Sequence, residues 1–173
     1  SILVIGVNHR SGPLSVLERV TLAPDEIPKA VDALVRRDNV REVAVLSTCN
    51  RTEVYAVTEK FHGAYADIRD FLCDVGSLAP DELHPHLFAQ HDDAAVAHLF
   101  EVASGLDSAV LGESEILGQV RSAAERAAEE RASGVTLGRL FQHAVEVGKR
   151  VRTDTAIARG TTSMSHAAVA MAA

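Results

Sequence analysis

Two short apolar runs separated by a polar hexapeptide constrain the fold of this chain more than any other feature. The first run, residues 43–46, is short and rich in β-branched side chains, as expected of a buried strand. The second, residues 53–58, alternates loosely between polar and apolar positions and carries valine and tyrosine, which favour strands. Residues 47–52 therefore predict the tip of a β-hairpin.

The pattern on both sides places this hairpin inside a mixed α/β domain. Residues 2–7 predict a strand, which ends in a loop of turn-forming residues at 8–13. Apolar residues recur at helical spacing in 25–37 and 63–75, and 83–90 predicts a last strand. The order strand, helix, strand, strand, helix, strand is the split βαβ pattern of a ferredoxin-like α+β sandwich, written βαββαβ.

The second half of the chain has a different character, because no strand signal remains after residue 91. Helices are predicted at 92–103, 113–132 and 135–158, with a loop at 105–112. We therefore expect the sandwich to be followed by an all-helical extension.

Composition excludes several classes of protein. The 173 residues fit one domain with a helical extension, and no apolar run approaches the roughly 20 residues that span a membrane. The start lacks the pattern of a secretory signal, and two cysteines make no disulfide framework, so we expect a cytoplasmic protein with free thiols. A net charge of -7 argues against indiscriminate coating of nucleic acid.

The hairpin tip contains Cys49 between Thr48 and Asn50, and Arg51 follows. A thiol beside a fixed cation forms the nucleophilic thiolate more readily, and a guanidinium can clamp a carboxylate with its planar fork. A lone intracellular cysteine is nevertheless most often a small packing residue, which is also our interpretation of Cys73. For Cys49, these residues alone leave packing and catalysis both open.

Three longer motifs extend the argument. Residues 47–55, STCNRTEVY, resemble the active-site signature of the glutamyl-tRNA reductases. Residues 6–11, GVNHRS, resemble the opening strand and loop of that family, and residues 103–120, ASGLDSAVLGESEILGQV, resemble its second signature. Because the three motifs occur in the family's order along the chain, the chain is identified as a member of this family.

The resemblance implies a reaction and roles for the residues of the first motif. The thiolate of Cys49 would attack the ester of glutamyl-tRNA(Glu), and hydride from NADPH would reduce the thioester to glutamate-1-semialdehyde for tetrapyrrole synthesis. Arg51 would bind a glutamate carboxylate, with Thr48 and Asn50 orienting the acyl group. By helical spacing His98 lies nearly opposite the apolar stripe of its helix and would be solvated, whereas the resemblance implies a role in activity, which we take as proton donation to the ribose oxygen.

The second motif is expected to help hold the substrate. By resemblance the residues concerned are Ser108, Glu113, Ser114, Glu115 and Gln119. Carboxylates at the start of a helix are also explained by the helix dipole alone. Many relatives carry Pro and Gln where this chain has Ser114 and Glu115, and a carboxylate there would suit the α-ammonium group of the substrate.

The resemblance also implies further parts of a longer enzyme. The glycines never form G-x-G-x-x-G, and in the family an NADPH domain and a dimerisation domain follow a connecting helix. We expect a catalytic core at 1–91, a helical part at 92–134 that completes the substrate pocket, and the start of the linker helix at 135–173. The whole enzyme would be a homodimer that passes its product to the aminomutase, with no metal and no membrane contact.

The segment 135–158 and the residue after it are locally basic. The positive residues are Arg139, Lys149, Arg150, Arg152 and Arg159. They are explained either by ordinary surface ion pairs or by contacts with tRNA phosphates.

Two alternatives belong to other functional classes. One is a cysteine hydrolase or acyltransferase that uses Cys49 and His98 without a reductant. The other is a non-catalytic ferredoxin-like RNA-binding module, which is disfavoured because two tyrosines, five phenylalanines and no tryptophan offer little for base stacking.

Overall fold

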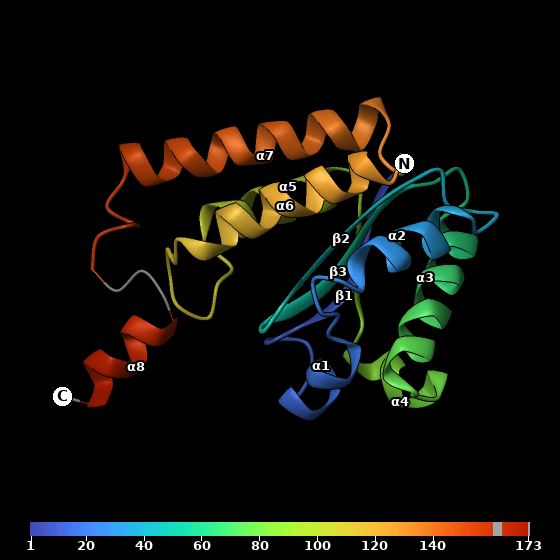
Figure 1. The fold of residues 1–173 in the computed structure, drawn as a ribbon, viewed down its shortest axis with the longest axis horizontal. Coiled ribbons are helices and arrows are strands. Elements are labelled where there is room, and N and C mark those ends of the chain that lie inside the picture. Colours follow the sequence, from blue (N-terminus) through green and yellow to red (C-terminus); the bar gives the residue numbers. More distant parts are fainter. Residues whose placement is uncertain (161–163, 173) are drawn as a thin grey trace.

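A computed structural model describes residues 1–160 and 164–172 of the chain. Four strands form one antiparallel sheet in the order β2-β3-β1-β4 (Figure 1). The strands are β1 Ile2–Asn8, β2 Glu42–Thr48, β3 Arg51–Val57 and β4 Phe88–His91. This order is the one that a split βαβ chain produces, so the predicted ferredoxin-like fold class is confirmed.

One face of the sheet is covered by the helices that connect the strands. These are α1 Leu14–Val20, α2 Ile27–Val35 and α3 Phe61–Gly76, followed by the short α4 Pro80–Leu83 and the 3-10 turn η1 His84–His86. They pack on alternate strand residues such as Ile5, Val45 and Val54, which are almost wholly buried. This face contains no candidate catalytic side chain and supplies the rigid base of the fold.

Two details of this layer differ from the prediction. Helix α1 lies where no element was expected, because its seven residues are too few to show a clear period. The strand predicted at 83–90 is wrong over its first half: residues 80–86 form α4 and η1, each with a proline in its first turn, and only 88–91 pair with β1.

The opposite face of the sheet is covered by a second helical layer. It consists of α5 Asp93–Ser104, α6 Glu115–Glu129 and α7 Val135–Asp154, which Figure 1 shows lying across the sheet from α2 and α3. The rings of Tyr55 from β3 and Phe141 from α7 meet edge to face at 5.4 Å. The expected helical extension therefore packs against the sheet and shares a core with it.

The chain ends in α8, Met164–Ala172. The sequence at 160–163, GTTS, predicts a break in the helical pattern, and this stretch falls largely outside the described residues. Within the part that the structure describes, no helix is both long enough and apolar enough to cross a membrane.

Candidate functional site

The hairpin tip presents Cys49 at the molecular surface. Thr48 pairs with Arg51, so Cys49 and Asn50 form a two-residue turn, and neither has the positive φ of the glycine-rich turns usual at this length. The turn has other support: Thr48 Oγ1 accepts a hydrogen bond from Asn50 N at 3.1 Å, and the Asn50 carbonyl accepts one from His9 N at 2.9 Å. The end of β1 thus holds the tip, and the Cys49 thiol remains exposed.

Arg51 points from β3 into the second layer and is 1% exposed. Its Nη1 donates to Glu53 Oε1 at 2.7 Å and to Asp107 Oδ2 at 3.0 Å, and its Nη2 donates to the Asp107 carbonyl at 2.7 Å. Two carboxylates of the chain itself therefore hold the guanidinium. The sequence had suggested a guanidinium free to clamp a substrate carboxylate, but that of Arg51 is already paired. A substrate carboxylate would therefore have to displace Asp107.

Glu53 is the centre of this network and was not singled out from the sequence. It is fully buried and accepts hydrogen bonds from Arg51, from Tyr55 Oη at 2.6 Å and from His98 Nε2 at 3.1 Å. Burial alone would raise the pKa of its carboxyl, but the hydrogen bond from His98 and the charge of Arg51 outweigh burial and lower the pKa overall. Gly6 lies opposite Glu53 in the register, and a Cβ at Gly6 would come within 3.1 Å of Glu53 Cγ.

The charges of this network also shift the pKa values of Tyr55 and His9. Burial and the charge of Glu53 raise the pKa of Tyr55 well above its ordinary value, so its hydroxyl stays a donor. Burial and the charge of Arg51 lower the pKa of the half-buried His9, which favours a neutral ring beside the hairpin tip.

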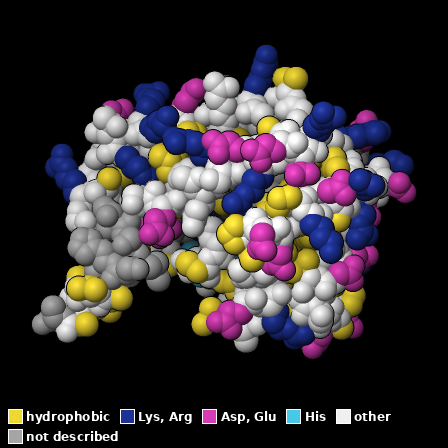
Figure 2. Space-filling view, in the orientation of Figure 1, with side chains coloured by type: hydrophobic (Ala, Val, Ile, Leu, Met, Phe, Trp, Pro, Cys, Tyr) yellow, Lys and Arg dark blue, Asp and Glu magenta, His cyan; other side chains and the backbone are white. Residues whose placement is uncertain are grey.

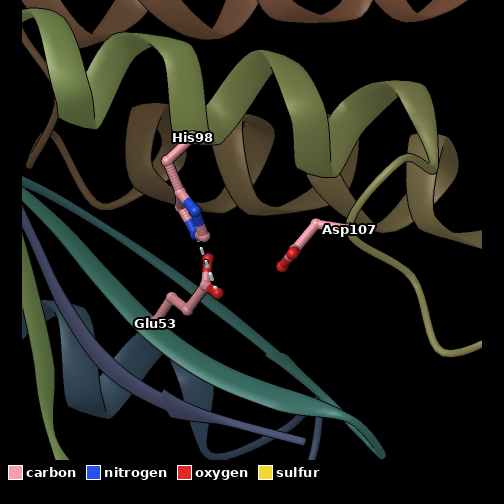
Figure 3. Close-up of side chains that lie close together, drawn as sticks. All are labelled: Glu53, His98 and Asp107. Carbon is pink, nitrogen blue, oxygen red and sulfur yellow. Dashed lines mark hydrogen bonds and ion pairs between the residues drawn. The ribbon is translucent and has the colours of Figure 1, made fainter. Parts of the chain in front are cut away.

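His98 is buried, which corrects the solvated position that helical spacing alone had indicated. The reason is that α5 lies between the sheet and α7, so the side opposite its apolar stripe is also covered. Figure 3 shows His98 descending from α5 toward Glu53, with Asp107 approaching from the following loop. With Nε2 directed at the carboxylate, Nδ1 is the nitrogen left for other partners.

Asp107 connects the loop at 105–114 to this network. It is 7% exposed, and its Oδ1 lies 3.1 Å from Arg10 Nη1 while its Oδ2 accepts from Arg51. Sequence reasoning missed both acidic partners. The spacing of Arg51 and Glu53, two apart on a strand, could have indicated a shared face, whereas Asp107 is too distant in sequence for any local pattern.

Glu53, His98 and Asp107 are also the described residues whose geometry could hold a metal ion, since one ligand atom of each lies within 4.8 Å of the others. Arg51 Nη1, however, donates a hydrogen bond to one oxygen of each carboxylate, Glu53 Oε1 and Asp107 Oδ2. The positive charge that two buried carboxylates require is therefore supplied by the guanidinium. These residues fit an ion-pair network better than a metal site.

The residues predicted from the second motif fall into two environments. Ser108 and Glu113 are buried on the loop, and burial together with the charge of Glu115 raises the pKa of Glu113. Ser114 is exposed just before α6. Glu115 and Gln119 on α6 line a groove of about 460 Å³ along the edge of β2.

A second hollow, of about 310 Å³, lies on the other side of the network. Its walls include His98 and Asp107 together with Arg10, Gln90 and Glu101. The network thus lies between two openings, one lined by His98 and Asp107 and the other by Glu115 and Gln119. The hairpin that carries Cys49 adjoins the groove through Ser47.

Comparison with known proteins decides the family. The model of a family described as "Glutamyl-tRNAGlu reductase, N-terminal domain" matches residues 5–155. The chain belongs to this family. The glutamyl-tRNA reductase of Geobacter metallireducens is 44% identical over 172 residues, which are 99% of this chain and 40% of that protein. The glutamyl-tRNA reductase of Bacillus subtilis is 44% identical over 171 residues, 99% of this chain and 38% of that protein.

A solved structure agrees with these relatives. Glutamyl-tRNA reductase from Methanopyrus kandleri is similar with a TM-score of 0.75 and 36% identity, over 99% of this chain and 39% of that one. The chain therefore spans about 40% of the length of the glutamyl-tRNA reductases that it matches.

Proposed function

We propose that this chain is the substrate-binding and acyl-transfer part of a glutamyl-tRNA reductase, an enzyme that reduces glutamyl-tRNA(Glu) to glutamate-1-semialdehyde at the start of tetrapyrrole synthesis. The observation that carries the proposal is the exposed Cys49 thiol at the tip of a hairpin in a chain of this family. The tip is held by β1, as a loop that must position a nucleophile requires.

In the proposed reaction, the sulfur of Cys49 attacks the ester carbonyl carbon of glutamyl-tRNA. A thioester bond forms, the bond to the ribose oxygen breaks, and that oxygen leaves with a proton. His98 supplies the proton, and Glu53 orients the imidazole by accepting from Nε2. Because Nε2 faces Glu53, the proton is transferred from Nδ1 or through a water molecule.

Recognition of the glutamyl group is assigned to residues of the hairpin tip and of the second motif. Thr48 and Asn50 orient the acyl group. A carboxylate of the glutamyl group replaces Asp107 as the partner of Arg51. Five residues complete the set: Ser108, Glu113, Ser114, Glu115 and Gln119. The exposed carboxylate of Glu115 suits the α-ammonium group.

The second half of the reaction needs a hydride, which NADPH supplies when it is bound to the complete enzyme. The sequence of this chain offers no G-x-G-x-x-G to hold that cofactor. We therefore assign residues 1–91 to the catalytic core, 92–134 to completion of the pocket and 135–173 to the start of the linker. In this proposal the complete enzyme is cytoplasmic and dimeric and passes its product to the aminomutase.

The experiment that tests the proposal is detection of the acyl-enzyme. The chain is mixed with glutamyl-tRNA, quenched in acid and digested, and mass spectrometry locates the glutamyl group. Wild type and a Cys73→Ser control should carry it on the peptide that contains Cys49, because Cys73 is buried on α3. The Cys49→Ser protein should carry none, and an adduct that persists in it would show that the nucleophile is another residue.

A further inference from the structure

We propose that Arg152, at the C-terminal end of α7, is a positioning residue that fastens both ends of the 105–114 loop and thereby sets the place of Asp107. This inference concerns a residue that was expected to belong to a basic surface strip. Its catalytic consequence rests on the proposed acylation at Cys49, whereas the structural contacts stand without it.

The guanidinium of Arg152 turns inward and donates to carbonyls on three segments. Nη1 donates to Ala103 at 2.7 Å and to Gly148 at 3.2 Å, and Nη2 donates to Glu113 at 2.7 Å. Ala103 lies in the last turn of α5, where carbonyls lack partners within the helix and a cation is favoured. Glu113 is at the other end of the loop, two residues before α6 begins at Glu115.

The packing around these bonds is close. A Cβ at Gly148 would lie 2.7 Å from the Ala103 carbonyl oxygen, so only glycine lets α7 approach α5 this closely. The base of the loop is closed by a hydrogen bond of 3.0 Å from Gly112 N to the Gly105 carbonyl. A Cβ at Gly112 would collide with the carbonyl of Ile157, which follows α7.

The loop that is fastened in this way carries Asp107, whose side chain and carbonyl both receive bonds from Arg51. Arg51 in turn shares Glu53 with His98. A shift of the loop base therefore moves the acceptor that opposes the proposed carboxylate clamp. Arg152 is therefore linked to the network at the hairpin through the loop backbone that carries Asp107.

A neighbouring arginine on the same helix supplies a matched control. Arg150 is exposed, and its ion pair is a distant one, 3.9 Å to Asp154. Figure 2 shows that basic and acidic side chains are interspersed over the visible face of the molecule. Arg150→Gln changes the net charge as Arg152→Gln does but leaves the loop untouched.

The test compares wild type, Arg152→Gln and Arg150→Gln in the 173-residue chain. Hydrogen exchange read by mass spectrometry should be faster by about tenfold in peptides covering 105–114 of Arg152→Gln and unchanged in Arg150→Gln. The maximal rate of single-turnover acylation of Arg152→Gln by glutamyl-tRNA should be about tenfold lower than that of wild type, because the acyl group is less well oriented. Alkylation of the exposed Cys49 by iodoacetamide should stay within about twofold of wild type.

Each outcome decides a separate point. If hydrogen exchange in the loop of Arg152→Gln is as slow as in wild type, Arg152 does not fasten the loop. If exchange is faster but the acylation rate equals that of wild type, Arg152 does not position the catalytic network. If wild type itself forms no acyl-enzyme, the proposed function fails while the exchange data still decide the loop. If Arg152→Gln no longer unfolds cooperatively, Arg152→Lys is used in its place. One ammonium group cannot reach both loop ends, so hydrogen exchange in residues 105–114 of Arg152→Lys should be at least about threefold faster than in wild type. Exchange at the wild-type rate in that variant would overturn the proposal.

Discussion

Glu53 is an unusual residue to find at the centre of a sheet, since a fully buried carboxylate is tolerated only when its partners supply both charge and hydrogen bonds. Here a guanidinium, an imidazole and a phenol converge on it. Removing the charge while keeping the shape therefore tests the whole network.

We expect Glu53→Gln to lower the free energy of unfolding by about 3 kcal/mol, because Arg51 is left buried with reduced compensation. Acylation of Cys49 should fall as well, since His98 loses its orienting acceptor. Urea unfolding at neutral pH measures the first effect, with the exposed Glu59→Gln as the control. Equal unfolding midpoints for the two variants would contradict the assigned role of Glu53.

The two buried glutamates should respond to pH with opposite signs. The pKa of Glu53 is lowered in the folded state, so its stabilisation is present above the ordinary glutamate pKa of about 4.3 and is lost as pH falls toward the folded value. The pKa of Glu113 is raised by burial, so its ionisation costs stability as pH rises from about 4.3 through the folded value.

Glu113→Gln should consequently stabilise the chain at neutral pH, and the gain should shrink in acid. The loss caused by Glu53→Gln should shrink in acid as well. Urea unfolding of the three proteins across the acid range gives both differences. Parallel curves for wild type and Glu113→Gln would contradict a raised pKa of Glu113 in the folded state.

At the scale of elements, substitution of two glycines of α7 by alanine should change the stability of the chain in opposite directions. A Cβ at Gly148 would lie 2.7 Å from the Ala103 carbonyl oxygen and 2.8 Å from Leu117 Cδ1, which is too close, whereas a Cβ at Gly138 would meet nothing within 4 Å. Gly148→Ala should destabilise the chain by about 1–3 kcal/mol through overpacking. Gly138→Ala should stabilise it by about 0.5–1 kcal/mol, because alanine loses less conformational freedom. The unfolding temperatures of the two variants, measured together with wild type, give both effects. Shifts in the same direction would contradict the packing of the Gly148 side of α7 against α5.

How far the sequence predicts these elements depends on the range of the interaction that forms them. The hairpin and the longer helices follow from local period and were predicted within a few residues. The short α1 and the prolines before β4 were misjudged because the period is too brief there. The burial of His98 and the contact between Arg51 and Asp107 could not be predicted, because both depend on how α5 and its loop pack on the sheet.

For the whole molecule, the proposal separates the two half-reactions. It assigns the residues of acyl transfer to this chain and the hydride source to a part of the enzyme outside these 173 residues. Given glutamyl-tRNA, the chain should form the thioester and then release free glutamate by slow attack of water. NADPH should alter neither the rate nor the product.

An assay of released glutamate and glutamate-1-semialdehyde, with and without NADPH, checks this expectation. Semialdehyde made by the 173-residue chain alone would contradict the division of labour, because it requires a cofactor site here. A fast hydrolytic turnover would instead favour the cysteine-hydrolase alternative over the reductase.

The position of the charged network between the sheet and the second layer also sets an order of events during biosynthesis. A ribosome makes the hairpin that carries Arg51 and Glu53 about 90 residues before it makes Phe141, whose ring packs against Tyr55. Until α5, α6 and α7 have been made, the nascent chain lacks the second helical layer and the core that this layer shares with the sheet. Cys49 is therefore synthesised well before His98 and Asp107, and the charged network near it is complete only after both have been made.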